Sequence, residues 1–180
     1  MKKRYLVFFI ISLYLMQIPL FINFMIINSE AYNTTLENIL SNSSLVFFII
    51  SIILGLVNLI MAFTNTNTNN NDIVKITMIS KLVLIPYFII NFIICTLLII
   101  GFAFVLTIFS TFILIPLFVF ITYMTMIITS SYNISYLINM FKNKEIDFIS
   151  FILHFIFQLV FICDVIDTIY IYKSNENMLK

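Results

Sequence analysis

The fold of this chain is decided by one apolar stretch, Leu82–Phe141, which reads LVLIPYFIINFIICTLLIIGFAFVLTIFSTFILIPLFVFITYMTMIITSSYNISYLINMF. This run of about 60 residues contains no Asp, Glu, Lys, Arg or His. A helix needs about 20 predominantly apolar residues to cross the hydrocarbon core of a bilayer, so the run holds at least two spans. It therefore predicts an integral membrane protein.

The composition of the whole chain agrees with this prediction. Hydrophobic residues make up 62% of the 180 residues and charged residues only 9%, whereas soluble domains carry about a quarter charged residues. The net charge of +1 leaves no basic surface for nucleic acid. We expect a single membrane domain over residues 1–180, with the lipid bilayer as its main partner and another membrane protein or a second copy as further candidates.

The apolar segments predict an all-α polytopic protein with about five transmembrane helices. At 1.5 Å per residue, each segment is long enough for a core of about 30 Å. The expected helices cover 5–27, 45–63, 82–102, 108–129 and 148–172. Residues 64–81 are expected to form a polar linker because they begin with the low-complexity tract TNTNTNNND. A cleavable signal peptide is disfavoured because the apolar part of 5–27 exceeds the usual length of about 7–15 residues.

Residues 130–141 are less apolar than the rest of the long run. Ile134, Leu137, Ile138 and Phe141 follow the i, i+3, i+4, i+7 pattern of an amphipathic helix. This pattern predicts a helix end that lies along the membrane interface and not a further span. Four or six transmembrane helices remain as alternatives.

The basic residues predict the orientation, because Lys and Arg near span ends collect on the cytoplasmic side. With five spans, seven basic residues lie on the side of the N-terminus and two on the other. The seven are Lys2, Lys3, Arg4, Lys75, Lys81, Lys142 and Lys144, and the two are Lys173 and Lys180. Six spans give the same ratio. The N-terminus is therefore expected in the cytoplasm, while the side of the C-terminus stays undecided.

The last apolar segment contains the candidate functional residues His154, Gln158, Asp164 and Asp167. An acidic residue inside a span costs about 2.5–3.5 kcal/mol on the insertion scale. Asp164 and Asp167 share a helix face with Thr168, and His154 shares another face with Gln158. Three interpretations are open: a proton or cation relay, an interfacial helix end with hydrated aspartates, or pairing with a basic residue of a partner protein.

Other chemistry has little support in the sequence. The single histidine has no nucleophile motif with which to build a triad, and the chain contains no glycine-rich phosphate loop. We therefore expect no enzymatic activity, no cofactor and no metal site. Cys95 and Cys163 lie in apolar runs and are expected to act as small hydrophobic residues. Gln17 and Asn23 are expected to make interhelical hydrogen bonds.

Three segments carry a resemblance to known proteins. They are Lys81-Leu82-x3-Pro86-x-Phe88-x2-Asn91-Phe92, Thr129-Ser130-Ser131-Tyr132-x-Ile134, and His154-x3-Gln158 continuing to Asp164-Val165-Ile166. Over about half of the chain, this pattern resembles a group of small uncharacterised multi-span membrane proteins of low-GC Gram-positive bacteria. The resemblance implies a bacterial plasma membrane as the location, and it implies no activity.

Two functions remain for such a chain. The expected function is an accessory or interaction component of the plasma membrane, such as a transporter partner or an immunity or stress factor. It is favoured because the segments between the helices are too short to bind a soluble ligand. The alternative is a small proton- or cation-coupled transporter or channel that uses the last helix.

Overall fold

The computed structural model describes residues 2–27, 34–64, 70–102 and 108–178. Within these ranges the protein forms six α-helices and no strand, which confirms the all-α prediction. The helices are α1 (Lys2–Ile27), α2 (Thr34–Thr64), α3 (Asn70–Phe102), α4 (Ile108–Lys142), α5 (Phe148–Phe157) and α6 (Phe161–Met178).

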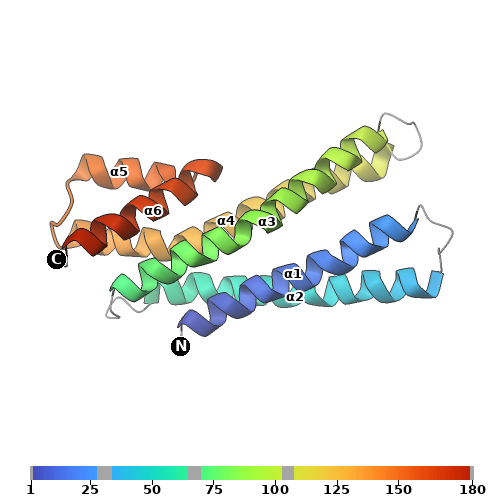
Figure 1. Ribbon diagram of the computed structural model, residues 1–180, viewed down its shortest axis with the longest axis horizontal. Helices are drawn as coiled ribbons and strands as arrows, with labels where there is room; N and C mark the ends of the chain where they lie inside the picture. Colours follow the sequence, from blue (N-terminus) through green and yellow to red (C-terminus); the bar gives the residue numbers. More distant parts are fainter. Residues whose placement is uncertain (1, 28–33, 65–69, 103–107, 179–180) are drawn as a thin grey trace.

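The four long helices form one elongated bundle, and each runs opposite to the helix before it (Figure 1). Helix α1 packs on α2 and α3, and α4 packs on α2 and α3. The short helices α5 and α6 form a hairpin that lies against α3 and α4. Both ends of the described chain lie at the same end of the bundle, where this hairpin is also found (Figure 1).

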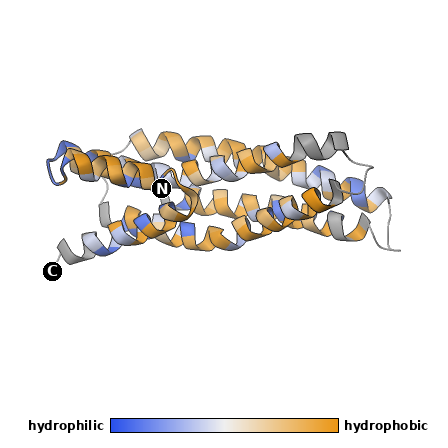
Figure 2. Ribbon diagram, turned by 90° about the horizontal axis from the view of Figure 1, so that it is seen from above, coloured by the Kyte–Doolittle hydropathy of each residue, from blue (hydrophilic) through white to orange (hydrophobic). Residues whose placement is uncertain are grey.

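The four long helices are long and apolar enough to cross a membrane by length and composition. Their apolar parts are Arg4–Asn23, Thr34–Thr64, Asp72–Leu97 and Ile115–Lys142. Hydrophobic residues cover the length of the bundle, while strongly hydrophilic residues gather near its ends (Figure 2). The protein is therefore an all-α polytopic membrane protein, and its described residues contain four helices of this kind.

The expected continuous helix over 148–172 is wrong. The chain turns at 158–160, between α5 and α6, and the turn is closed by backbone bonds from Leu159 N–H to Ile156 O (3.0 Å) and from Val160 N–H to Phe157 O (3.2 Å). No Gly or Pro marks this turn in the sequence. Its physical advantage is that α6 folds back, so that polar groups from both helices meet polar groups of α3 and α4.

Two further segments differ from expectation. The expected interfacial helix end at 130–141 is part of α4, and every residue from Ser130 to Leu137 is buried. Neighbouring helices cover this part of α4, so Asn133 lies in the interior and not at an interface. The expected polar linker 64–81 contributes most of its length to helices, because α2 continues to Thr64 and α3 begins at Asn70.

Polar side chains join the helices inside the bundle. Gln17 on α1 donates from Nε2 to the Asn91 side chain on α3 (2.8 Å), which confirms its predicted interhelical role. Asn58 on α2 donates to the Tyr5 carbonyl (3.1 Å) and accepts from the Tyr132 hydroxyl (2.8 Å). The side chain of Asn23, the other residue expected to bond, makes no hydrogen bond to another described residue. In an apolar surrounding such bonds fix the relative positions of helices.

Gly55 permits the close approach of α2 to α4 and α1. A Cβ atom at this position would lie 2.7 Å from Ile128 Cδ1 and 3.3 Å from Phe9 Cε2. We expect Gly55→Leu to destabilise the folded protein by about 1–3 kcal/mol, because the larger side chain overpacks this contact. Thermal unfolding in detergent measures the effect. The control Ile60→Phe enlarges an exposed residue on the same helix, and an equal loss there would contradict the assignment to packing.

Candidate functional site

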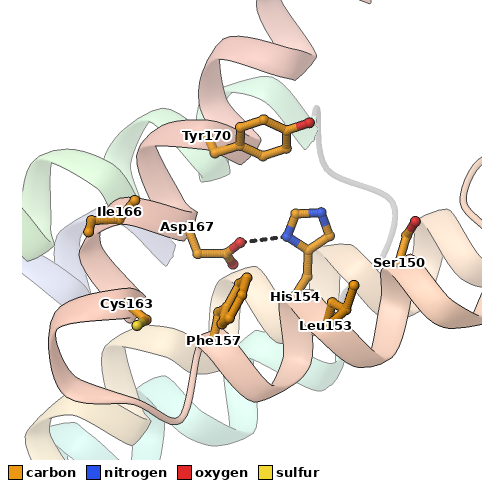
Figure 3. A pocket seen from close by; sticks show the side chains of 8 residues that line it. All are labelled: Ser150, Leu153, His154, Phe157, Cys163, Ile166, Asp167 and Tyr170. Atoms are coloured by element: carbon orange, nitrogen blue, oxygen red, sulfur yellow. Dashed lines mark hydrogen bonds and ion pairs between the residues drawn. The ribbon is translucent and has the colours of Figure 1, made fainter.

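The hairpin of α5 and α6 holds a histidine–carboxylate pair. His154 Nδ1 on α5 lies 2.5 Å from Asp167 Oδ1 on α6 (Figure 3). The Asp167 side chain is 3% exposed, while His154 is 21% exposed. Because an ionised carboxylate only accepts hydrogen bonds, Nδ1 carries the proton in this pair. The second ring nitrogen of His154 makes no hydrogen bond to any described residue.

Two cavities border His154, and the larger of them also borders Asp167. The larger, about 380 Å³, is lined by Ser150, Leu153, His154, Phe157, Cys163, Ile166, Asp167 and Tyr170 (Figure 3). The smaller, about 170 Å³, is lined by Tyr136, Leu137, Met140, Ile146, Ser150, His154, Tyr170, Ile171 and Ser174. The rings of His154 and Tyr170 are stacked, with centroids 5.6 Å apart, and they contribute to both cavities. His154 therefore borders both cavities.

Gln158 connects this pair to the interior of the bundle. It follows the last residue of α5 and is completely buried. Its Nε2 donates to Asp167 Oδ2 (2.6 Å), and its Oε1 accepts from Lys81 Nζ (2.7 Å). One amide side chain thus bridges the carboxylate of the hairpin and the ammonium group of α3.

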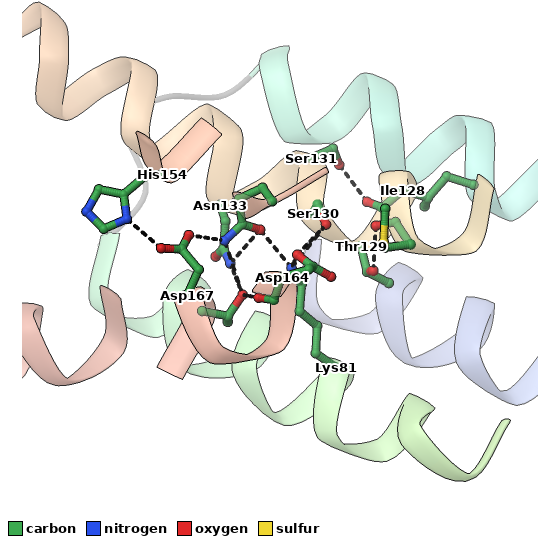
Figure 4. Close-up of polar contacts among 12 residues, drawn as sticks. Lys81, Ile128, Thr129, Ser130, Ser131, Asn133, His154, Asp164 and Asp167 are labelled. Carbon is green, nitrogen blue, oxygen red and sulfur yellow. Dashed lines mark hydrogen bonds and ion pairs between the residues drawn. The ribbon is translucent and has the colours of Figure 1, made fainter. Parts of the chain in front are cut away.

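Lys81 forms a buried ion pair with Asp164 of α6 (Figure 4). Their side chains are 2% and 3% exposed. Lys81 also donates to Ser130 Oγ of α4 (3.0 Å), so together with Asp164 and Gln158 it has three acceptors for its three N–H groups. Ser130 in turn donates to Asp164 Oδ1 (2.8 Å). The ion pair is thus held by α3, α4 and the hairpin together.

The pair lies deep in the apolar part of the bundle. Lys81 is about four residues from the middle of Asp72–Leu97, or about 6 Å at 1.5 Å per residue. Asn133 on α4 closes the network from the other side by donating to Thr168 Oγ1 (2.6 Å), and Thr168 donates to the Asp164 carbonyl (2.7 Å). Burial of two charges in a low dielectric is costly unless each is paired and hydrogen-bonded, and this network meets both conditions.

We call the residues His154, Asp167, Gln158, Lys81, Asp164, Ser130, Asn133 and Thr168 the polar network. With the Lys81–Asp164 ion pair formed and Asp167 ionised, the network contains one ammonium and two carboxylates. With a neutral His154 the network carries one net negative charge, and with a protonated His154 it carries none. The histidine is thus the group that can balance Asp167.

All four candidate residues from the sequence meet in this network, although they come from α5, α6 and the turn between them and not from one helix. The expected shared face of Asp164, Asp167 and Thr168 is present, because all three belong to α6 and are buried. Lys81 was not expected there, since it counted as a cytoplasmic residue at the membrane edge. Two features of the sequence pointed to Lys81 as a partner. It is followed by apolar residues, and the carboxylates of Asp164 and Asp167 lie in another apolar segment, where they require a positive charge. The contributions of Ser130 and Asn133 had no such signal.

The described residues contain no group of three or more His, Cys, Asp or Glu that could hold a metal ion. Cys95 and Cys163 are both free thiols. What the polar network offers is therefore a set of proton donors and acceptors.

Comparison with known proteins gives one match. The model of a family of unknown function (DUF6652) matches residues 2–177. No curated protein and no solved structure matches the chain.

Proposed function

The chain belongs to the family of unknown function DUF6652. From the geometry of the polar network, we propose that it is a small proton-coupled transporter of the plasma membrane. In this proposal His154 exchanges protons with solvent, and Asp167 holds the proton-bearing ring. The Lys81–Asp164 pair anchors the hairpin to the bundle. The activity moves protons and involves no covalent catalysis.

The observation that carries the proposal is the continuous hydrogen-bonded connection from His154 through Asp167 and Gln158 to Lys81. It begins at a side chain that borders two cavities and ends in the middle of an apolar bundle. Stability alone does not account for a buried ion pair, because apolar residues of similar size at the same positions often stabilise a protein as well or better. Ionisable residues within a membrane usually mark an ion or proton pathway.

Protonation of His154 would couple to the position of the hairpin. A protonated ring balances Asp167, and the network is then neutral. Loss of the proton leaves a net negative charge in an apolar surrounding, which favours rearrangement of the hairpin or binding of another cation. Helix α5 has no buried residue, so few contacts oppose its movement.

The distribution of basic residues supports an N-terminus in the cytoplasm. The connections 28–33 and 103–107 join helices at one end of the bundle, and neither contains Lys or Arg. Of the eight basic residues in the described ranges, seven lie at the ends of the described chain or near the connections at the opposite end, and Lys81 lies in the half of α3 nearer to that end. Under the positive-inside rule this end faces the cytoplasm. The hairpin would then lie in the cytoplasmic half of the membrane.

Proteoliposomes test this function. A potassium gradient with valinomycin imposes a membrane potential, and an enclosed pH dye reports proton entry. We expect the wild-type protein to acidify the vesicles faster than protein-free vesicles do, and Asp167→Asn to lose this excess rate. Glu145→Gln is the matched control, because it removes a carboxylate from an exposed turn. Equal rates for the wild type and Asp167→Asn would contradict the proposal.

An accessory role remains the second candidate, and one observation favours it. The outer side of the hairpin exposes large apolar residues, including Phe148 (61%), Ile149 (68%) and Ile162 (71%), which another membrane protein would cover as well as lipid does. Copurification from mild detergent distinguishes the two functions. A stable complex with a different protein favours the accessory role, whereas an isolated or self-associated chain with proton flux favours the transporter.

A further inference from the structure

The larger cavity of the hairpin has the dimensions and lining of a ligand site. Its volume of about 380 Å³ lies within the range of about 300–1,000 Å³ that is typical of small-molecule pockets. Most of the lining is apolar, and Leu153, Phe157 and Ile166 are also exposed on the surface of the hairpin. An occupant is therefore largely hydrophobic, and it reaches the cavity from the lipid side.

The polar wall of the cavity selects the charge of the occupant. Asp167 and His154 line it together, and they carry one net negative charge when the histidine is neutral. Lys81 and Asp164 on the far side of Gln158 already balance each other. An anionic ligand would face an unbalanced carboxylate, and a neutral ligand would leave that charge without compensation. A cation would balance it, and the aromatic rings of Phe157 and Tyr170 are further favourable partners for a cation.

We infer that the α5–α6 cavity binds an amphipathic organic cation, which replaces the proton of His154 as the positive charge beside Asp167. The inference rests on the proposed function for its role in transport, where the cation would compete with the transported proton at the His154–Asp167 pair. The exchange is balanced in charge: the protonated His154–Asp167 pair takes up one monovalent cation and releases one proton to solvent.

The competition predicts a direction for the effect of pH. The other titratable groups near His154 are Tyr136 on α4, Tyr170 and Cys163 on α6, and the Asp164–Lys81 pair. A tyrosine or a cysteine carries no positive charge in any protonation state, and Asp164 and Lys81 are paired with each other. His154 is therefore the group whose proton competes with the cation. Cation binding strengthens as the pH rises through the range in which His154 loses its proton, and it becomes constant above that range.

Equilibrium binding to the purified full chain in detergent tests the inference. The probe is tetraphenylphosphonium, and tetraphenylborate is an anion of the same shape. We expect saturable binding of the cation and none of the anion. In the pH range where His154 is protonated, the affinity for the cation should rise about tenfold for each unit by which the pH is raised. Each bound cation should release about one proton. Calorimetry in two buffers of different ionisation enthalpy counts the protons. Affinity that does not change with pH, or saturable binding of the anion, would overturn the inference.

Two variants locate the probe without disturbing the polar network. Ile166→Trp fills the cavity from an exposed position on α6, and Ile162→Trp adds the same side chain on the same helix at a position that does not line the cavity. We expect the first to abolish cation binding and the second to retain it, with equal thermal stability. Binding that survives Ile166→Trp would place the probe elsewhere and overturn the inference.

The results of this experiment and of the proton-flux experiment are separable. Proton flux without cation binding removes this inference and leaves the proposed function in place. Cation binding with proton release but without flux supports the site and removes the transport function.

Discussion

Replacement of Lys81 by methionine is expected to lower the stability of the folded protein by about 3–5 kcal/mol, which is typical for breaking a buried ion pair from one side. The methionine side chain has a similar length, so the loss does not come from a cavity. It comes from Asp164, whose carboxylate remains 3% exposed and has no balancing charge. The loss is measured by heating samples of the tagged, detergent-solubilised protein and recording the temperature at which its size-exclusion peak disappears.

The double variant Lys81→Met with Asp164→Asn separates charge from packing. It removes both charges and leaves an amide that still accepts from Ser130, so we expect most of the lost stability to return. Lys142→Met is the control, because Lys142 is exposed at the end of α4 and its removal costs little, within about 0.5 kcal/mol. If the double variant is as unstable as Lys81→Met, the ion pair is not the source of the effect.

The second large effect concerns topology. A reporter fused after Lys180 is expected to read entirely cytoplasmic, on the same side as the N-terminus. The physical reason is the even number of long helices and the return of α6 towards the end of the bundle where α1 begins (Figure 1). A five-span chain would place the same reporter outside. Paired fusions to a protein that fluoresces only in the cytoplasm and to an enzyme that is active only outside give opposite signals on the two sides.

A reporter inserted between α3 and α4, within 103–107, is the internal control for this experiment. It is expected on the outer side, because the proposed orientation places the connection 65–69 in the cytoplasm and α3 crosses the membrane once after it. A C-terminal reporter with an outside signal would contradict both the four-helix topology and the proposed position of the hairpin in the cytoplasmic half.

The membrane character and the long helices follow from local properties of the sequence. An apolar segment of about 20 residues satisfies its backbone hydrogen bonds within itself only as a helix, whatever surrounds it. For this reason the expected helices at 5–27, 45–63, 82–102 and 108–129 all overlap helices of the structure. The helix ends were less predictable, since polar residues such as Ser131 and Asn133 continue a helix where neighbouring helices cover them.

The last segment shows where local reasoning fails. Phe148–Tyr172 is as apolar and as long as a span, and it contains no Gly or Pro to announce a turn. The turn at 158–160 is favoured by contacts that arise only after folding, because Gln158 then bonds to Lys81 and Asp167 at once. In one straight helix, Gln158 and Asp164 would be separated by six residues and would point in different directions.

By itself, the sequence determined that this is an all-α membrane protein and that four polar residues of its last segment are out of place in lipid. Both conclusions depend on hydrophobic length and on the cost of a polar group in an apolar medium, which are local quantities. Only the tertiary structure decided that the last segment is a hairpin and that Lys81 is the partner of Asp164. These two residues are 83 positions apart in sequence, and the pairing of distant charges depends on which helix faces pack together, a property of the assembled bundle.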